Sequence, residues 1–592
     1  MKPGPNAPCP CGSGRKYKKC HGGAGAAASR AASPAPASAD GWLARGAQLE
    51  AAREPAQAER CYQQALAIEP ASAAAWFAMG RLAERAGDIA TAQQCFQQLV
   101  ALHPAHAPGH FALGNVHARQ FDFDRARAEY RAALEHDPTL VGVWGNLGNI
   151  EKYLGRFASA LDCYRRAIEQ ETDPAQQARL HSNLLLALHY DERLDHDALC
   201  AAHRDWGERH ARALHPSPAA WPNARDAARP LRIGYVSASF ADNEIMGHFL
   251  QSVLAQHDRA RHSIRLYSST RGPEAAKANL RRQADAWIDI GALDDAAAAA
   301  RIRADAIDIL VDLDGHNPTG RPLIFARKPA PIQVEWLDWF DTSGMTAIDY
   351  VLTDPYTTPA GSLQRFTETV VHLPHCRLCY TPVDHAPPVA PPPHLAGAPF
   401  TFGSFNRQDK LYPALLSVWA DILHAVPDAR LLLKNRALQI DAVRRQVAAT
   451  FDGFGIDAGR LVLRGPTPHA EMMAEYADID IALDTFPYNG GLTTCECLWM
   501  GVPLVALEAE RMIGRQSAAM LRLLGQDDWV AGGVADYVRL AVEWSRRRAE
   551  LADLRAALRP RLAQSPICDA PRFARDLEAA YRAMWERWCA SA

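Results

Sequence analysis

Between residues 40 and 174, the apolar positions of the chain recur with a fixed period of 34 residues. Glycines, prolines, alanines and aromatic residues each form a row with this spacing. The rows are Gly80, Gly114 and Gly148; Pro70, Pro104 and Pro138; Ala92, Ala126 and Ala160; and Tyr62, Phe96, Tyr130 and Tyr164. Small residues at a fixed spacing let helices cross closely, and each helical unit then buries its apolar face against its neighbours. The pattern predicts an α-solenoid of four helical units over residues 40–174.

A unit of this length with proline at its end is typical of tetratricopeptide repeats. Residues 175–228 keep a helical pattern but lose the period, so we expect a degenerate repeat and connecting helices there. Residues 23–39, rich in Gly, Ala, Ser and Pro, are predicted to form a flexible linker before the repeats. The concave face of a solenoid suits an extended protein segment, which predicts protein partners. A purely structural solenoid is the alternative.

The pattern changes at residue 229, where short apolar runs typical of buried strands begin to alternate with helical segments. The runs lie at 230–237, 263–267, 307–312, 332–336 and 350–353, and then at 400–406, 430–434, 460–463, 479–484 and 503–506. This alternation predicts two doubly wound α/β halves, residues 229–381 and 400–565. The Pro-rich stretch at 382–399 can be neither helix nor central strand, so it is expected to link them. An amphipathic helix is expected within residues 566–592.

Residues 484–503 of the second half have the order expected of a phosphate site. A strand-like run leads into a glycine pair, a threonine pair and the start of a helix. The residues concerned are Asp484, Gly490, Gly491, Thr493, Thr494 and Glu496. Free backbone N–H groups and the helix dipole would there point at one spot, which favours an anion. A capped strand-to-helix turn without a ligand is the alternative.

Composition narrows the classes of function. The chain has 592 residues and a formal net charge of −3, so no overall field favours nucleic acid or a membrane surface. No apolar run reaches the roughly 18 residues needed to span a bilayer, and the N-terminus lacks the apolar core of a secretory signal. The 13 cysteines are scattered along the chain, which favours reduced thiols. We therefore expect a cytoplasmic protein.

Four residues of metal-binding type lie close together within residues 5–22. They are Cys9, Cys11, Cys20 and His21. Three thiolates and an imidazole are a ligand set for tetrahedral Zn²⁺, and so short a segment would depend on the metal for its folding free energy. A basic tail with incidental cysteines is the alternative. The run resembles the SEC-C motif, a small zinc-binding module, and the resemblance implies an appendage that docks a partner.

Five further runs in the two halves are specific. They are Arg-Ile-Gly-Tyr-Val-Ser at 232–237, Ile-Leu-Val-Asp-Leu-Asp-Gly-His at 309–316, Pro-Ala-Pro-Ile-Gln-Val at 329–334, Leu-Cys-Tyr-Thr-Pro at 378–382 and Phe-Gly-Ser-Phe-Asn at 402–406. The stretch at 484–503, which begins Asp-Thr-Phe-Pro-Tyr, is equally specific. With these runs, residues 40–590 resemble the protein O-GlcNAc transferase family and its SPINDLY branch. The resemblance implies the GT-B glycosyltransferase fold with two Rossmann-like halves. It also implies an inverting transfer of a sugar from a nucleotide, UDP-GlcNAc first, to Ser or Thr hydroxyls of proteins, with no metal at the reaction centre.

The resemblance assigns a group of residues to the donor. Lys410 matches a lysine that contacts the diphosphate, where a cation would stabilise charge that develops as the glycosidic bond breaks. Thr493 and Thr494 align with phosphate-binding threonines, and Glu496 aligns with an acidic residue on the ribose hydroxyls. The remaining donor contacts are assigned to Asn406, Asp484 and Gly490.

The acceptor side is assigned to two histidines. His248 matches the second histidine of an active-site loop in the family, and His316 matches a Tyr/His position near the acceptor. Both are catalytic candidates, with Lys410, and either could receive the acceptor's proton. A carboxylate such as Asp308 or Asp312 behind them, a phosphate oxygen or a water is the alternative.

The chain also departs from the family's pattern. The departures are Asn243, Asp341, Arg407, Met472, Gly491 and Leu492. Leu492 replaces the first of the usual threonine pair, and Met472 stands where relatives carry a nucleotide-contacting histidine, with His469 three residues away. Because several of these positions line the donor pocket, the donor stays open. The alternatives are GDP-fucose, which SPINDLY-type enzymes use, and a repeat scaffold whose transferase half is inactive.

Overall fold

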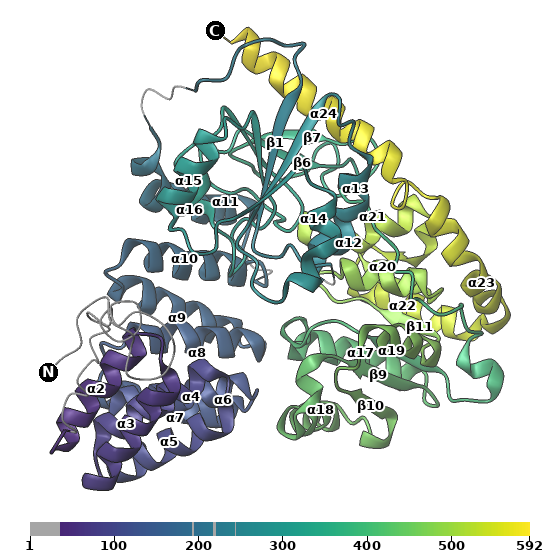
Figure 1. Ribbon diagram of the computed structural model, residues 1–592. Helices are drawn as coiled ribbons and strands as arrows, with labels where there is room; N and C mark the ends of the chain where they lie inside the picture. Colours follow the sequence, from purple (N-terminus) through teal and green to yellow (C-terminus); the bar gives the residue numbers. More distant parts are fainter. Residues whose placement is uncertain (1–35, 192–193, 217–220, 243, 592) are drawn as a thin grey trace, which may run out of the picture. The chain divides into compact units, whose positions relative to one another are not determined.

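The computed structural model describes residues 36–191, 194–216, 221–242 and 244–591 (Figure 1). The chain divides into two compact units, residues 1–138 and 139–592. Among the described helices, none is both long enough and apolar enough to cross a membrane. The proposed zinc ligands Cys9, Cys11, Cys20 and His21 lie outside the described residues.

The described part of the first unit is a series of three helix pairs. These are α2 (Ala39–Ala51) with α3 (Pro55–Ile68), α4 (Ala73–Ala86) with α5 (Ile89–Leu102), and α6 (Ala107–Arg119) with α7 (Phe123–His136). The second unit opens with a fourth pair, α8 (Val141–Tyr153) and α9 (Phe157–Gln170). The predicted series of helix pairs is therefore confirmed.

The glycine row and the aromatic row are two sides of one repeated contact. A Cβ atom added to Gly80 would lie 2.4 Å from the ring of Phe96, and one on Gly114 would lie 2.5 Å from the ring of Tyr130. The pairs Gly46–Tyr62 and Gly148–Tyr164 repeat this geometry. Each aromatic ring packs on bare backbone, so a side chain at the glycine would push the two helices of the pair apart.

The second unit continues through connecting helices into a seven-stranded parallel sheet. The connection comprises α10 (Pro174–Leu188), α11 (His196–Trp206), a π-helical turn (Gly207–Ala211) and a 3₁₀ turn (Arg212–Leu214). The strand order is β3-β2-β1-β4-β5-β6-β7. The strands are β1 (Leu231–Ser237), β2 (His262–Ser268), β3 (Ala286–Asp289), β4 (Ile309–Asp312), β5 (Ile332–Glu335), β6 (Tyr350–Thr353) and β7 (Thr369–His372).

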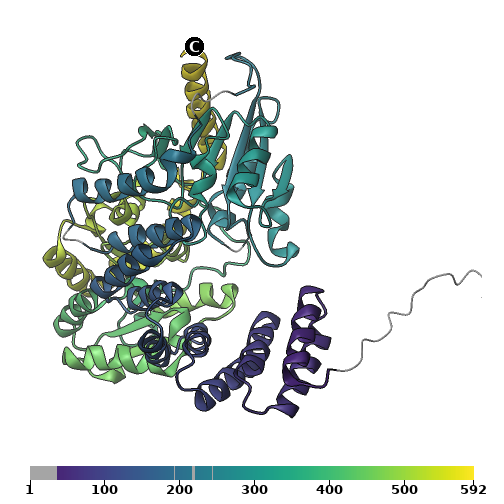
Figure 2. The same ribbon diagram turned by 90° about the vertical axis from the view of Figure 1, so that its left-hand side faces the viewer.

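Helices cover both faces of this first sheet, as the two views show (Figures 1 and 2). They are α12 (Ile245–Phe249), α13 (Gln251–Gln256), α14 (Ala278–Arg282), α15 (Asp295–Ala304) and α16 (Pro322–Ala326). Strands β1, β4 and β5 are buried along almost their whole length. That burial is why they read as continuous apolar runs in the sequence.

The second sheet has six parallel strands in the order β10-β9-β8-β11-β12-β13. They are β8 (Thr401–Ser404), β9 (Arg430–Lys434), β10 (Leu461–Arg464), β11 (Ile481–Leu483), β12 (Leu504–Leu507) and β13 (Val530–Ala531). Its helices are α17 (Pro413–Ala425), α18 (Asp441–Gly453), α19 (His469–Glu475), α20 (Leu492–Trp499), α21 (Gln516–Leu523) and α22 (Val534–Arg546). The predicted pair of doubly wound halves is confirmed.

The chain ends by returning to the first half. After α23 (Arg548–Gln564), helix α24 (Ala570–Ala590) contacts β5 and α13 of the first half. Figure 1 shows α24 as the helix that ends at the C-terminus and runs along the first half. Its buried face carries Tyr581, Met584 and Trp585. This burial agrees with the amphipathic helix that was expected within residues 566–592.

Three strands escaped the sequence pattern, and all lie at sheet edges. β3 and β7 are the two outer strands of the first sheet, and β13 is an outer strand of the second. The side chains of β7 are mostly exposed and those of β3 are only partly buried. Edge strands need no continuous apolar run, so hydrophobic periodicity does not reveal them.

Candidate functional site

The candidate site lies at the carboxyl ends of β8 and β11, the two central strands of the second sheet. These strands pair directly, with Ala482 opposite Gly403. The strand order reverses direction between them, because β9 and β10 lie beyond β8 while β12 and β13 lie beyond β11. In parallel α/β sheets such a switch point is where ligands bind. The loops that follow β8 and β11 carry all the residues assigned to the diphosphate.

A glycine turn after β11 brings the hydroxyl groups together. The backbone N–H of Gly490 donates to Oδ1 of Asp484 at 2.9 Å. A Cβ atom on Gly490 would lie 2.5 Å from Oγ1 of Thr494 and 2.7 Å from Oγ1 of Thr493. Thr493 in turn donates to Oδ1 of Asn406, at the end of β8, over 3.3 Å. The structure therefore joins Asn406, Asp484, Gly490, Thr493 and Thr494 at the start of α20, where free backbone N–H groups favour an anion.

Lys410 brings a positive charge to the same turn. It lies in a short 3₁₀ turn (Gln408–Lys410) after β8 and is buried. Its Nζ donates to the carbonyl oxygen of Asn489 at 2.5 Å and lies 3.9 Å from the centre of the Tyr488 ring. Burial, followed by the nearby charge of Arg407, lowers the pKa of Lys410 to about 7. Because burial disfavours the charged form of this lysine, an anionic ligand that replaced the contact with Asn489 would stabilise the ammonium group.

The fourth repeat supports this turn through a line of aromatic rings. Phe157 of α9 stacks on Tyr190 with ring centres 4.7 Å apart, and Tyr190 lies 5.6 Å from Tyr488. The hydroxyl of Tyr190 also donates to Oδ2 of Asp409 over 3.4 Å. Through Tyr190, the fourth repeat therefore supports both loops beside Lys410, the loop after β8 and the loop after β11.

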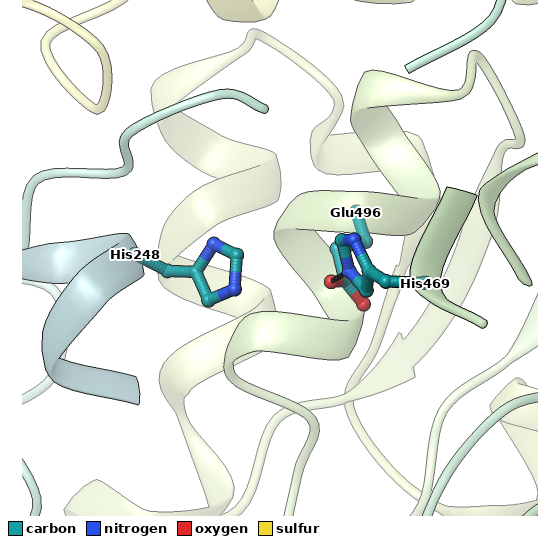
Figure 3. Close-up of side chains that lie close together, drawn as sticks. All are labelled: His248, His469 and Glu496. Carbon is teal, nitrogen blue, oxygen red and sulfur yellow. Dashed lines mark hydrogen bonds and ion pairs between the residues drawn. The ribbon is translucent and has the colours of Figure 1, made fainter. Parts of the chain in front are cut away.

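Glu496 lies one turn into α20, close to the imidazole rings of several histidines (Figure 3). Its Oε1 lies 2.7 Å from Nε2 of His469, and Nδ1 of His469 lies 2.7 Å from Nε2 of His385. Burial raises the pKa of Glu496. His248 of α12 faces this pair, with its ring centre 5.6 Å from that of His469. Burial lowers the pKa of His248 to about 4, so the imidazole is neutral near pH 7.

The second catalytic candidate, His316, is fully buried away from this group. Its Nδ1 lies 3.0 Å from Oγ of Ser182 and its Nε2 lies 2.8 Å from the carbonyl oxygen of Ser343. Its ring packs edge-on against Trp206 at 4.6 Å. Since both nitrogens already have partners, His316 is better suited to join the connecting helices to the first half than to accept a proton from a substrate.

The two carboxylates suggested behind the histidines lie at opposite ends of β4. Asp308 precedes the strand and accepts hydrogen bonds from the side chain of Arg229 and, at 2.7 Å, from the backbone of Arg232. Asp308 therefore stabilises the amino-terminal end of β4, opposite to the carboxyl end of the strand. Asp312 ends the strand, and burial raises its pKa to about 7. Both carboxylate oxygens of its neighbour Glu335 lack a hydrogen-bond partner among the described residues.

Two further carboxylates, which the sequence analysis did not identify, follow strands of the first sheet. Asp314 follows β4 and Asp338 follows β5. Asp314 accepts from Oγ of Ser237 at 2.7 Å. Asp338 accepts from Nδ2 of Asn317 at 2.9 Å, and burial raises its pKa to about 7 against the opposing charges of residues that include Lys410. Asp338 therefore lies close enough to the second half for the charge of Lys410 to affect its pKa. A position directly after a strand of a parallel sheet is the signal that could have identified it.

The departures from the family's pattern fall in different places. Leu492 begins α20 without a hydroxyl, whereas Thr493 keeps one in the turn. Met472 lies within α19, and the histidine that reaches Glu496 is His469 at the start of that helix. Asp341 is buried outside the turn and accepts from the backbone N–H of Thr342 at 2.7 Å. Gly491 precedes α20, and Arg407 pairs with Asp409 over 3.4 Å. Asn243 lies outside the described residues.

Two all-parallel α/β sheets in one unit, with a glycine turn at the switch point of the second, match the GT-B class of glycosyltransferase folds. The chain belongs to glycosyl transferase family 41. The sequence model of that family matches residues 165–386 and 394–577. Tetratricopeptide models match residues 39–82, 77–140 and 141–173, and the SEC-C model matches residues 6–23. The predicted family, the tetratricopeptide repeats and the SEC-C motif itself are thereby confirmed.

Individual relatives agree with this placement. The chain is 39% identical over 414 residues to the probable UDP-N-acetylglucosamine–peptide N-acetylglucosaminyltransferase SPINDLY of Arabidopsis thaliana, which covers 69% of this chain and 45% of that protein. It is 30% identical over 387 residues to the SEC protein of the same plant, covering 63% of this chain and 39% of that protein. The chain therefore spans less than half the length of these curated relatives. A solved mutant of the Thermobaculum terrenum O-GlcNAc transferase superposes with a TM-score of 0.80 at 36% identity, covering 88% of this chain and 98% of that one.

The titration of Lys410 gives the first testable prediction. If a sugar nucleotide binds the protonated form of Lys410, its affinity should fall as pH rises through about 7, by up to about tenfold per pH unit. Lys410→Met should bind weakly without this pH dependence, whereas Lys410→Arg should stay charged and show a flat profile. Calorimetric titration about one unit on each side of pH 7 measures this. A pH-dependent Lys410→Met variant with the parent's affinity would contradict the assignment.

Proposed function

We propose that this chain is an inverting protein O-glycosyltransferase that moves a sugar from a nucleotide donor to Ser or Thr hydroxyls of proteins. The observation that carries the proposal is the buried ammonium group of Lys410 beside the Gly490 turn and the start of α20. The names of the relatives support UDP-GlcNAc as the donor. GDP-fucose is the second candidate, because Leu492 at the start of α20 and Met472 in α19 depart from the family's donor-side pattern and leave the donor open.

The transfer would be a single displacement. The acceptor hydroxyl attacks the anomeric carbon from the face opposite the diphosphate, and the diphosphate leaves with additional negative charge. Lys410 and the backbone N–H groups at the start of α20 would stabilise that charge, because they are fixed in place before the bond breaks. Thr493 would hold the phosphates through its hydroxyl, and Glu496 would accept hydrogen bonds from the ribose.

Two residues are the candidates to receive the acceptor's proton. Asp338 has a pKa raised to about 7, which matches a general base that works near neutral pH. His248 is neutral, but its lowered pKa makes it a weaker base. If Asp338 is the base, transfer should require its deprotonated form and therefore increase with pH through the acidic side of neutrality.

Protein acceptors would be held by the repeats. In the first unit, a cavity of about 560 Å³ opens between neighbouring repeats and combines apolar, polar and charged side chains. Its lining includes Phe77, Arg81, Glu84, Arg85, Phe111 and Arg119. Aromatic rings and guanidinium groups together suit an extended polypeptide with both apolar and acidic side chains.

The N-terminal SEC-C segment would bind Zn²⁺ through Cys9, Cys11, Cys20 and His21, since three thiolates and an imidazole satisfy a tetrahedral structural site. The segment would then serve as a docking module for another protein. A cytoplasmic location is also part of the proposal, because buried free thiols such as Cys376, Cys495 and Cys497 suit a reducing compartment.

A direct assay tests the function. The full chain is incubated with a cell lysate and with UDP-GlcNAc or GDP-fucose in separate reactions, and modified Ser or Thr residues are identified by mass spectrometry. Transfer from one donor is expected, and Lys410→Met should lose roughly 100- to 1,000-fold in rate. The same substitution should leave the melting temperature close to that of the parent. Neither transfer nor binding of either donor would exclude the enzyme.

The zinc proposal for the SEC-C segment has its own test. Cobalt bound at thiolates gives an intense sulfur-to-metal charge-transfer absorption, so the cobalt-loaded full chain should show this band. Cys9→Ser should weaken the band, while Cys589→Ser, which removes a partly exposed cysteine near the C-terminus, should leave it unchanged. A parent chain without the band would refute the site.

A further inference from the structure

Three potential metal ligands meet between the two halves of the second unit. His248 comes from α12 of the first half, whereas His469 and Glu496 come from α19 and α20 of the second. One ligand atom from each of the three lies within 4.8 Å of the others, and Figure 3 shows the His248 ring directed at the His469–Glu496 pair. The ligand atoms around a tetrahedral Zn²⁺ lie roughly 3–3.5 Å apart. Small rotations of these side chains would therefore enclose an ion.

The hydrogen bonds present do not use up this group. Among the described residues, no hydrogen bond is recorded to the imidazole of His248, although the residue is only 4% exposed. Glu496 is 3% exposed, and its recorded hydrogen bond is the one to His469. The ring nitrogens of His248 and the lone pairs of Glu496 that do not engage His469 therefore remain available to a metal ion.

A histidine outside the group fixes the orientation of His469. Nδ1 of His469 lies 2.7 Å from Nε2 of His385, which belongs to the Pro-rich link. Histidines that bind metals typically engage their other ring nitrogen in this way, which directs the ligating nitrogen and sets its tautomer. Here the nitrogen left to ligate, Nε2, is the one that faces Glu496.

A second group of the same composition serves as a comparison within the chain. His257, His262 and Glu578 also lie close enough to share an ion. There, however, Oε1 of Glu578 already accepts from the backbone of Asp258 at 2.8 Å and lies 2.9 Å from Nδ1 of His257. Glu496, by contrast, has His469 as its hydrogen-bond partner among the described residues. The carboxylate of the second group is satisfied by protein, and the carboxylate of the first is not.

We propose that a divalent transition-metal ion of the zinc type binds between His248, His469 and Glu496, with its fourth position open. Such an ion would tie the first half to the second. It would also occupy Glu496, so a metal-bound chain would exclude the ribose of a sugar nucleotide. This exclusion rests on the proposed function, whereas the metal site itself does not. The ion would inhibit the enzyme and take no part in the transfer.

Cobalt titration of the full chain tests the site without an activity assay. The parent should bind one more equivalent of Co²⁺ than either His469→Gln or Glu496→Gln. Both variants should keep the charge-transfer band of the SEC-C segment, because the lost ion has only nitrogen and oxygen ligands. His372→Asn, which changes an exposed histidine of β7, is the matched control and should bind as the parent does. Equal stoichiometry in the parent and in both variants, with folding verified by circular dichroism, would overturn the site.

A competition experiment tests the exclusion separately. UDP or GDP added in excess to the cobalt-loaded parent should release the equivalent that His469→Gln lacks, and added Zn²⁺ should raise the apparent Kd of the nucleotide at least several-fold. His469→Gln should lose this zinc effect. Nucleotide and metal bound at once, each with its own affinity unchanged, would overturn the exclusion. A chain that binds the metal but no nucleotide would confirm the site and count against the proposed function.

Discussion

A positive charge held out of water at a glycine turn is the interaction on which the candidate site depends. Removing an ammonium group from water costs several kcal/mol unless other groups compensate. For Lys410 the compensation comes from the carbonyl oxygen of Asn489, the face of the Tyr488 ring and the nearby carboxylate of Asp484. The compensation is incomplete, as the lowered pKa of Lys410 indicates. A bound diphosphate would complete it, so the same desolvation that destabilises the empty site favours the anionic ligand.

Close backbone contacts hold the surrounding elements in place. A Cβ atom on Gly344, after β5, would lie 2.0 Å from the carbonyl oxygen of His203 in α11, and one on Gly155, before α9, would lie 2.7 Å from Cβ of Tyr412. The connecting helices therefore pack directly on the first half, and the fourth repeat packs on the second. The rings of Phe157 and Tyr190 continue this contact to the turn that holds Lys410, so the fourth repeat and the candidate site are packed together within the second unit.

Sequence predicted the parts of this structure that repeat or follow a period. The glycine and aromatic rows gave the helix pairs because each row records one packing contact, as for Gly114 and Tyr130. The turn at Gly490 was predictable because its residues are neighbours in the chain. The pairing of Glu496 with His469 was not, since it depends on how α19 and α20 pack. The engaged nitrogens of His316 and the raised pKa of Asp338 follow from burial, which no local pattern encodes.

The most direct test of the account is a structure of the chain with UDP-GlcNAc or GDP-fucose bound. The account predicts the diphosphate within hydrogen-bond distance of Nζ of Lys410, of the Thr493 hydroxyl and of the backbone N–H groups at the start of α20. It also predicts the ribose hydroxyls on Glu496. A diphosphate bound elsewhere, with Lys410 still donating to Asn489, would contradict it.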